Sequence, residues 1–359
     1  KMIKEYNDEI IDALQKDFGN RDPKSSFLTE IATTIGVLQH AIKNVDKWTK
    51  DEKRPSNVDR PFFIRMLMGF LGSKSYIKYQ PLGTVGVISP WNFPVNLILA
   101  PLGGIFAAGN RAMIKPSELT PATSEVTKRM FEAYFDKSEA AVFTGDAEVG
   151  AAFSALPFDH LLFTGGTQIG KKVMKAASDN LVPVTLELGG KSPVIVDENA
   201  DLSDVAKKVM RGKTMNAGQI CLAPDYLMLP KGKSEEFAKA SNEAVSEMFA
   251  DLKYNEDYTS VINERHYERI NELVSDAKEK GAEVIQINPA DEDFEQQELH
   301  KIPPTLVLNP TDEMKIMQEE IFGPVLPVKE YEDFDETVNY INSKDRPLGL
   351  YLFSKDKSK

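Results

Sequence analysis

One cysteine stands in a sequence context that could support covalent chemistry. Cys221 is the only cysteine in the chain, and it follows Asn-Ala-Gly-Gln-Ile at 216–220, just after a predicted helix ends. That context suits a thiol held on a turn with free backbone N–H groups nearby. A cysteine thiol is intrinsically nucleophilic, although it is mostly protonated near pH 7. The alternative is a structural cysteine buried in the core, which is the commonest fate of a free cysteine.

A glutamate and an asparagine could assist such a nucleophile. Glu187 lies in an apolar stretch directly before Gly189 and Gly190. A buried carboxylate is costly unless it is used or paired, and its raised pKa suits a general base. The alternative is a structural carboxylate that caps the Gly-Gly turn. Asn92, in Pro-Trp-Asn-Phe-Pro at 90–94, follows a predicted strand. Its amide could donate to an oxyanion, or it could simply cap the following helix.

Three further motifs are typical of ligand contacts. Phe-Thr-Gly-Gly-Thr at 163–167 runs from an apolar strand into a predicted helix, where backbone N–H groups can bind a phosphate. The glycine spacing differs from the G-x-G-x-x-G fingerprint, so an ordinary tight turn is the alternative. Lys-Pro-Ser-Glu at 115–118 and Glu-Glu-Ile-Phe-Gly-Pro at 319–324 place charged groups that could also be plain surface turns.

The elements that must position these residues follow an α/β pattern. From residue 82 onward, short apolar strands alternate with Gly/Pro turns and helices, beginning with a strand at 85–88 and a helix at 94–108. This alternation predicts a parallel sheet that is covered by helices on both faces. Residues 1–53 are predicted to form two helices, interrupted at 19–23.

The composition excludes several function classes. At roughly 150 residues per domain, the 359 residues suggest two or three domains. The net charge of −12 argues against binding to nucleic acids or to anionic membranes. The 4 histidines have no ligand-like spacing, so we predict no metal site. A single cysteine excludes an intrachain disulfide and favours a reducing compartment, so we expect a cytoplasmic location.

An uncharged stretch at 79–110 is not predicted to span a membrane. It contains four prolines and five glycines, and Asn92 and Asn96 add polar groups. The longest apolar run within it is too short to cross a bilayer. We therefore interpret this stretch as buried core.

The order of the motifs resembles the aldehyde dehydrogenase superfamily. The matching motifs are Pro-Trp-Asn-Phe-Pro, Lys-Pro-Ser-Glu, Phe-Thr-Gly-Gly-Thr, Glu-Leu-Gly-Gly-Lys, Gly-Gln-Ile-Cys and Glu-Glu-Ile-Phe-Gly-Pro. The resemblance covers about residues 10–355. The segment at 218–226 resembles the class 3 branch, and the segments at 156–160 and 223–226 are most similar to coniferyl aldehyde dehydrogenases.

The resemblance implies a role for each motif residue. The implied catalytic residues are Cys221 as the nucleophile, Glu187 as the general base and Asn92 as the side chain of the oxyanion hole. The implied cofactor contacts are Lys115 and Glu118 at the adenosine ribose, Gly165, Gly166 and Thr167 at the pyrophosphate, Glu320 at the nicotinamide ribose and Phe322 near the nicotinamide. The implied cofactor is NAD, because the charge of Glu118 would repel the 2′-phosphate of NADP. Lys115 softens that repulsion, so some use of NADP is compatible with the sequence.

The resemblance also implies a domain organisation and a reaction. We expect a Rossmann-like NAD-binding domain at 1–187 with an oligomerisation arm at 58–80, an α/β catalytic domain at 188–347, and a homodimer. Because the family continues beyond this point, we expect 348–359 to begin a C-terminal segment that is truncated here. The expected reaction oxidises an aldehyde to the acid through a thiohemiacetal and a thioester. The expected substrate is aromatic, such as coniferyl aldehyde, or a medium- to long-chain aliphatic aldehyde.

Three other functions compete with this interpretation. A coenzyme-A-acylating or semialdehyde dehydrogenase would have the same fold, but Glu187 favours water as the acyl acceptor. A cysteine hydrolase needs a histidine beside the thiol, and no histidine has such a setting. A non-enzymatic binding protein would not need the nucleophile, the base and the oxyanion donor together. One departure from the family pattern is Gly166, where the family usually has serine and one hydroxyl contact to the pyrophosphate.

Overall fold

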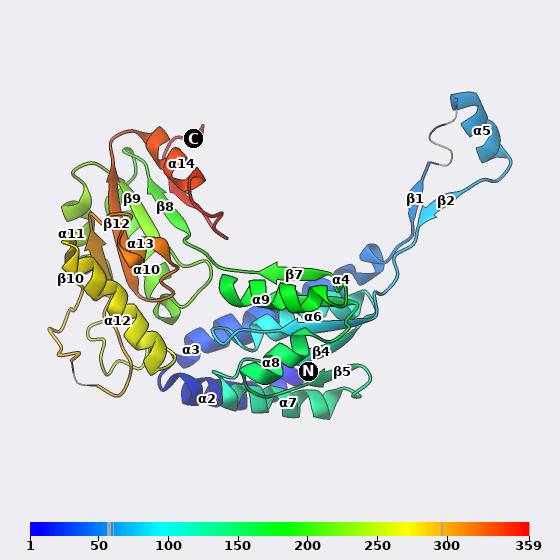
Figure 1. The fold of residues 1–359 in the computed structure, drawn as a ribbon, viewed down its shortest axis with the longest axis horizontal. Coiled ribbons are helices and arrows are strands. Elements are labelled where there is room, and N and C mark those ends of the chain that lie inside the picture. Colours follow the sequence, from blue (N-terminus) through cyan, green and yellow to red (C-terminus); the bar gives the residue numbers. More distant parts are fainter. Residues whose placement is uncertain (56–58, 60, 296, 359) are drawn as a thin grey trace.

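The chain folds into two α/β units and a projecting arm (Figure 1). The computed structural model describes residues 1–55, 59, 61–295 and 297–358. Each unit is built on its own sheet, and most neighbouring strands in both sheets run parallel. The predicted α/β fold is therefore confirmed.

The N-terminal helices pack beside the first unit. They are α1 (Met2–Glu5), α2 (Asn7–Phe18), α3 (Pro23–Ser26), the π-helical segment η1 (Phe27–Ala32) and α4 (Thr33–Trp48). The predicted interruption at 19–23 lies where α2 ends and α3 begins. Asp22 caps α3 by accepting hydrogen bonds from the backbone N–H groups of Lys24 and Ser25, and Pro23 occupies the first helical position.

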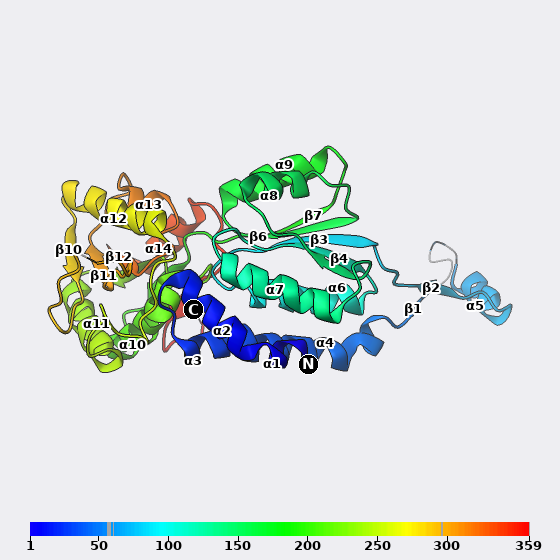
Figure 2. The same ribbon diagram turned by 90° about the horizontal axis from the view of Figure 1, so that it is seen from below.

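The first sheet is entirely parallel among its described strands. Its strands are β3 (Thr84–Ile88), β4 (Arg111–Lys115), β5 (Ala140–Val142), β6 (His160–Thr164) and β7 (Val184–Glu187), in the order β5-β4-β3-β6-β7. Figure 2 shows α8 (Ala147–Ser154) and α9 (Thr167–Ser178) on one face, and α6 (Asn96–Ala107) and α7 (Pro121–Tyr134) on the other. The central strands are apolar because helices cover both faces.

The strand order of the first sheet creates a crevice at one edge. The chain moves outward from β3 through β4 to β5, and it then returns to add β6 on the other side of β3. The direction of winding therefore reverses between β3 and β6. In parallel α/β sheets, ligands bind outside the carboxyl ends of the strands at such a reversal.

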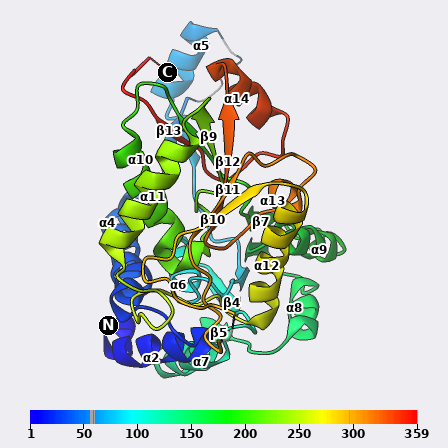
Figure 3. The same cartoon turned by 90° about the vertical axis from the view of Figure 1, so that its left-hand side faces the viewer.

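The second sheet has six strands with helices on both faces. Its strands are β8 (Pro193–Val196), β9 (Tyr226–Pro230), β10 (Glu283–Gln286), β11 (Thr305–Leu308), β12 (Val325–Tyr331) and β13 (Tyr351–Phe353), in the order β10-β11-β12-β9-β8-β13. In Figure 3, α10 (Leu202–Thr214) and α11 (Ser234–Met248) lie on one face, with α12 (Glu264–Glu279) and α13 (Lys315–Gln318) on the other. The remaining elements are η2 (Met215–Gly218) and α14 (Phe334–Asn342).

The second sheet extends past residue 347, where the sequence places the end of this unit. β13 pairs in parallel with β8, through Tyr351 beside Val194 and Phe353 beside Val196. The backbone hydrogen bonds of β13 thus belong to the second sheet. Residues 351–353 are therefore structurally part of this unit.

The arm carries an exposed apolar helix at its tip. β1 (Glu52–Arg54) and β2 (Ser75–Ile77) form an antiparallel ribbon that projects from the first unit, with α5 (Phe62–Phe70) beyond it (Figures 1 and 2). The ribbon begins before the predicted start of the arm, and positions 58 and 60 lie outside the described residues. Phe62 and Phe70 are 77% and 88% exposed. Within the described part of the chain, no helix has the length and apolarity needed to cross a bilayer.

Candidate active site

The predicted ligand contacts of the first unit gather at the carboxyl edge of its sheet. Asn92 follows β3, Lys115 ends β4, Gly165 follows β6 and Glu187 ends β7. The backbone N–H of Gly165 donates a hydrogen bond to the carbonyl oxygen of Glu187 at 3.0 Å. Motifs that are far apart in the sequence therefore share one edge, because the strands before them run parallel.

The turn before Cys221 has a conformation that depends on glycine. Asn216 and Ala217 have φ angles of 49° and 51°, and Gly218 follows with φ of 70°. A Cβ atom on Gly218 would collide with the backbone carbonyl of Gly323. The turn can therefore pack closely against the 319–324 segment only because position 218 has no side chain.

The thiol of Cys221 lies at a partly exposed position between the two units. It belongs to none of the four buried apolar clusters, so it is not a core cysteine. Burial raises the pKa of Cys221, and the charges of Glu320 and Glu187 raise it further. The backbone N–H groups of Cys221 and Leu222 lower the same pKa. The structure thus brings both glutamates within electrostatic range of the sulfur.

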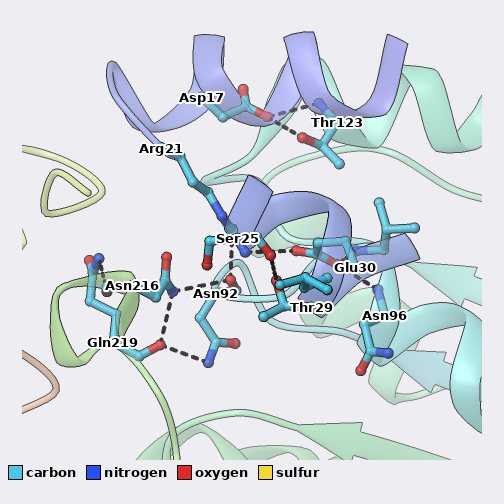
Figure 4. A network of polar contacts seen from close by, with 12 residues as sticks. Asp17, Arg21, Ser25, Thr29, Glu30, Asn92, Asn96, Thr123, Asn216 and Gln219 are labelled. Atoms are coloured by element: carbon cyan, nitrogen blue, oxygen red, sulfur yellow. Dashed lines mark hydrogen bonds and ion pairs between the residues drawn. The ribbon is translucent and has the colours of Figure 1, made fainter. Parts of the chain in front are cut away.

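Asn92 is buried against the turn that carries Cys221 (Figure 4). Its Nδ2 donates a hydrogen bond to the carbonyl oxygen of Gln219 at 3.0 Å. An amide nitrogen carries two hydrogens, so a second donor remains on Nδ2. Its Oδ1 has no hydrogen-bond partner among the described residues. Asn92 therefore reaches the cysteine turn and keeps donor capacity beside it.

The predicted burial of Glu187 is wrong, because its side chain is exposed. β7 is an edge strand, because among the described strands only β6 pairs with it. Alternate residues of β7 are exposed, and Glu187 falls on the solvated set. The apolar run at 184–188 suggested a covered strand, but the edge position leaves this carboxylate in contact with solvent. Its charge still acts on Cys221.

Lys115 and Glu118 form a pair at the end of β4. Lys115 is buried, and its Nζ lies 3.7 Å from Oε2 of Glu118. Burial lowers the pKa of Lys115, and the charge of Glu118 opposes this effect. The side chain of Glu118 is 44% exposed, and it lines an open cavity of about 640 Å³. A carboxylate with this exposure can accept hydrogen bonds from a ligand that enters from solvent.

The Gly165–Gly166 turn presents the beginning of α9 to the same edge. Gly166 is the residue before α9, and no side chain caps the helix there. A Cβ atom on Gly165 would lie 2.7 Å from the ring of Phe163, whereas one on Gly166 would meet no atom within 4 Å. Gly166 and Thr167 are exposed. The backbone of the first residues of this turn is therefore accessible to a phosphate, although Ile169 N–H already donates to the carbonyl oxygen of Gly166 at 3.1 Å.

Glu320 and Phe322 approach the site from the second unit. The Glu320 carboxylate packs so closely against Gly189 that any side chain at 189 would collide with it. Burial raises the pKa of Glu320 to about 7, and the backbone N–H of Gly190 opposes this rise. Phe322 packs edge-on against Trp91 with 5.3 Å between ring centroids. Both residues therefore lie close to the Asn92 and Cys221 segments.

Sequence reasoning missed the charged residues that hold the 319–321 backbone. Lys191 forms an ion pair with Asp225, and its Nζ donates to the carbonyl oxygen of Glu319 at 2.9 Å. Asp225 in turn accepts the backbone N–H of Ile321 at 2.9 Å. Arg269 donates to the carbonyl oxygens of Glu320 and Ile321. The sequence did carry a signal for these two residues. Lys191 directly follows Gly-Gly, Asp225 comes shortly after Cys221, and each places a charge beside an apolar strand.

Arg21 and Glu30 were missed as well. They form an ion pair behind Asn92, and both are buried. The signal was a glutamate inside the apolar segment Phe-Leu-Thr-Glu-Ile at 27–31.

The assembled groups suit a dinucleotide and a reactive carbonyl. Two carboxylates, Glu118 and Glu320, can accept hydrogen bonds from ribose hydroxyls, and the start of α9 can receive a pyrophosphate. A thiol, an amide and two backbone N–H groups converge where a carbonyl could be attacked. Across the described residues, no cluster of three or more His, Cys, Asp or Glu side chains could hold a metal ion.

Comparison with known proteins gives the same picture over the full length of the chain. Residues 1–359 match the aldehyde dehydrogenase family. The chain is 57% identical over 350 residues to a probable coniferyl aldehyde dehydrogenase of Caulobacter vibrioides, covering 98% of this chain and 71% of that protein. It is 50% identical over 355 residues to a coniferyl aldehyde dehydrogenase of a Pseudomonas species, covering 99% and 71%.

A solved structure agrees in fold. The structure of a Mycobacterium tuberculosis aldehyde dehydrogenase complexed with NAD⁺ superimposes with a TM-score of 0.85 at 25% identity, covering 99% of this chain and 71% of that one. The cofactor of this chain is accordingly of the NAD type. The reaction is the oxidation of an aldehyde to its carboxylic acid. The chain belongs to the aldehyde dehydrogenase family.

Proposed function

We propose that this chain oxidises its aldehyde by covalent catalysis through Cys221. The observation that carries the proposal is the convergence of the Cys221 thiol, the Asn92 amide and the charges of Glu187 and Glu320 at one place. The thiolate attacks the carbonyl carbon, and negative charge develops on the carbonyl oxygen. The Asn92 amide and the Cys221 backbone N–H donate hydrogen bonds to that oxygen, and one such donor is typically worth about 3–4 kcal/mol.

Glu187 acts in the second half of the reaction. When bound, the cofactor supplies the acceptor for the hydride that leaves the thiohemiacetal carbon. The resulting thioester is attacked by water, and Glu187 takes a proton from that water. The exposed position of Glu187 supports this role, because the carboxylate can pass its proton to solvent after each turnover.

The remaining motif residues bind the cofactor in our proposal. Lys115 and Glu118 contact the adenosine ribose. Gly165, Gly166 and Thr167 receive the pyrophosphate through the first turn of α9. Glu320 contacts the nicotinamide ribose, and Phe322 packs near the nicotinamide. Support comes from the position of the first two groups at the carboxyl edge of the sheet and from the packing of Phe322 on Trp91, next to Asn92.

We propose NAD rather than NADP as the preferred cofactor, with Glu118 as the discriminating residue. The parent enzyme is expected to have a lower KM for NAD than for NADP, because the carboxylate repels a 2′-phosphate. Glu118→Gln is expected to narrow the ratio of the two KM values by about tenfold, a modest effect because the site is half-exposed and Lys115 lies nearby. Initial-rate kinetics with both cofactors measure this ratio.

The matched control is Glu235→Gln, which removes an exposed carboxylate from α11 in the second unit. This variant should leave the KM ratio unchanged. A parent enzyme with a lower KM for NADP than for NAD would refute the role of Glu118.

We propose an apolar aldehyde as the substrate, with coniferyl aldehyde as the sharpest candidate. Both similar curated proteins carry that substrate in their names. Trp91 and Phe93 flank Asn92, and Trp91 also packs against His266 with 5.1 Å between ring centroids. Arg269 is engaged by the carbonyl oxygens of Glu320 and Ile321, so it is not poised to bind a second carboxylate. Helix α5 and the arm that carries it project away from the site (Figure 1).

A substrate panel tests the proposal. We expect kcat/KM to be highest for coniferyl aldehyde or for another apolar aldehyde among benzaldehyde, hexanal and dodecanal. Succinate semialdehyde should be at least about tenfold poorer, because burying an unpaired carboxylate in apolar surroundings is costly. NADH formation at saturating NAD is the measurement. Succinate semialdehyde as the best substrate of the five would contradict the apolar preference.

We further propose that residues 1–187 form the NAD-binding domain and that the unit from residue 188 is the catalytic domain, which includes β13.

The arm mediates a homodimer in this proposal. Helix α5 exposes Phe62, Phe63 and Phe70 among other apolar side chains, and an apolar patch of this kind marks an interaction site. A second copy of the chain would cover this apolar patch.

We propose a cytoplasmic location, because the nucleophilic thiol must stay reduced.

A further inference from the structure

A fully buried ion pair lies behind the segment that carries Asn92. The side chains of Arg21 and Glu30 are 2% and 0% exposed, and Nη2 of Arg21 donates to Oε1 of Glu30 at 3.1 Å. Burying two charges costs more than an apolar pair of similar volume would, so such a pair is weak evidence for stability alone. The other hydrogen bonds of Arg21 and Glu30 indicate the function of this ion pair.

Arg21 fixes the peptide at Asn92. Its Nη1 donates a hydrogen bond to the carbonyl oxygen of Asn92 at 2.9 Å. The guanidinium also lies over the rings of Phe18 and Phe93, at 4.6 Å and 5.2 Å from their centroids. Because Phe93 directly follows Asn92, the guanidinium contacts both a carbonyl and a side chain at the same peptide unit.

Glu30 fixes the other end of the same segment. Its Oε2 accepts the backbone N–H groups of Val95 at 3.1 Å and Asn96 at 2.7 Å, where α6 begins. One side chain thus holds the start of α6, and its partner holds Asn92 a few residues earlier. Figure 4 shows the two charges between the Asn92 backbone and Asn96. The ion pair therefore sets the conformation of the 92–96 segment from one side.

The turn that precedes Cys221 forms hydrogen bonds with Asn92 from the side opposite Arg21. The Asn92 amide donates to the Gln219 carbonyl, and Asn216 Nδ2 reaches the Asn92 carbonyl at 3.4 Å. Gln219 is itself anchored, because its Oε1 accepts the backbone N–H of Ile262 at 3.0 Å. A continuous set of hydrogen bonds thus runs from Glu30 through Arg21 and Asn92 to the residue two positions before Cys221.

We propose that Arg21 and Glu30 are positioning residues, which orient the Asn92 amide for the oxyanion formed on the substrate. The proposal rests on the role of Asn92 proposed above. Arginine suits this task because its planar fork donates to the Glu30 carboxylate and to the Asn92 carbonyl at once. A lysine keeps the charge but has no rigid fork. The amide hydrogen bonds of Asn92 then lose their fixed direction.

A double-mutant cycle between Arg21→Lys and Asn92→Ala tests the proposal on the full chain. In the parent background, Arg21→Lys is expected to lower kcat/KM for the aldehyde about tenfold, with the KM for NAD within about twofold of the parent value. In the Asn92→Ala background, the same change is expected to lower kcat/KM by less than about twofold, because the group it positions is already gone.

The outcomes of the cycle distinguish the positioning role of Arg21 and Glu30 from the oxyanion role of Asn92. An equal loss from Arg21→Lys in both backgrounds would show a merely structural role and would overturn the inference alone. If Asn92→Ala left kcat/KM unchanged, the oxyanion role of Asn92 would fail and the inference would fail with it. If Arg21→Lys lowered kcat/KM in the parent background only, the result would support both the positioning role of Arg21 and the oxyanion role of Asn92.

Two further variants guard against a folding artefact. Tyr331→Phe removes a buried hydrogen bond to the carbonyl oxygen of Val196 in the second unit, and it should change kcat/KM in neither background. If Arg21→Lys does not fold, the Arg21→Gln/Glu30→Gln variant removes both charges together and leaves no unpaired buried charge. The same background dependence is expected for it, and equal losses in both backgrounds would again overturn the inference.

Discussion

Replacing Cys221 with alanine is expected to lower kcat for aldehyde oxidation by at least about 10⁴-fold, because no covalent intermediate can form without the thiol. The side chain is only partly buried, so the loss of one sulfur atom should move the thermal midpoint by no more than about 2 °C. NADH formation and thermal unfolding of the same preparation measure the two effects.

The single cysteine supplies a control for this result. Iodoacetamide should inactivate the parent enzyme in step with the incorporation of one label per chain, and Cys221→Ala should take up none. Because burial and the charges of Glu320 and Glu187 raise the pKa of Cys221, the thiolate fraction is small near neutral pH. The alkylation rate of the free enzyme should therefore rise with pH until it passes that raised pKa. Substantial aldehyde oxidation by Cys221→Ala would contradict the covalent mechanism.

Replacing Glu187 with glutamine is expected to separate the two halves of the reaction. Glutamine has nearly the same shape but cannot take a proton from water, so hydrolysis of the thioester should slow by about 10²-fold or more. The first turnover does not need this base, and a burst of NADH should persist. Rapid-mixing absorbance of NADH measures the burst and the steady state in one trace.

Two comparisons sharpen the Glu187 experiment. Hydroxylamine attacks a thioester without help from a general base, so it should partly restore turnover in Glu187→Gln and yield the hydroxamate. Asp179→Asn removes another exposed carboxylate of the first unit, at the end of α9, and should leave both phases unchanged. Loss of the burst in Glu187→Gln would reassign Glu187 to activation of the thiol.

Local sequence information was enough to predict the fold class and the groups that could react. Apolar strands that alternate with helices require both faces of a sheet to be covered, so the α/β fold follows from hydrophobic pattern alone. The Gly-Gly turns at 165–166 and 189–190 were also visible, because a glycine acts on the backbone where it stands. The order of the motifs then pointed to the family.

The exposure of Glu187 depended on long-range strand pairing. Whether β7 is central or at an edge is decided by which strands pair with it, and the apolar residues around Glu187 look the same in both cases. The same applies to residues 351–353, whose place in the second sheet is set by pairing with β8, more than a hundred residues earlier in the chain.

The partners of the buried charged residues depended even more on tertiary structure. Arg21 meets the carbonyl of Asn92 across 71 residues, and Lys191 meets Asp225 across 34. Hydrophobic periodicity indicates which positions face a core, but it does not indicate which charge will find its partner there. The residue types and the hydrophobic pattern were enough to predict the reactive groups and the strands that carry them. Only the packing of the N-terminal helices, the first sheet and the cysteine turn decided how Asn92 is held beside Cys221, because those contacts join segments that share no local pattern.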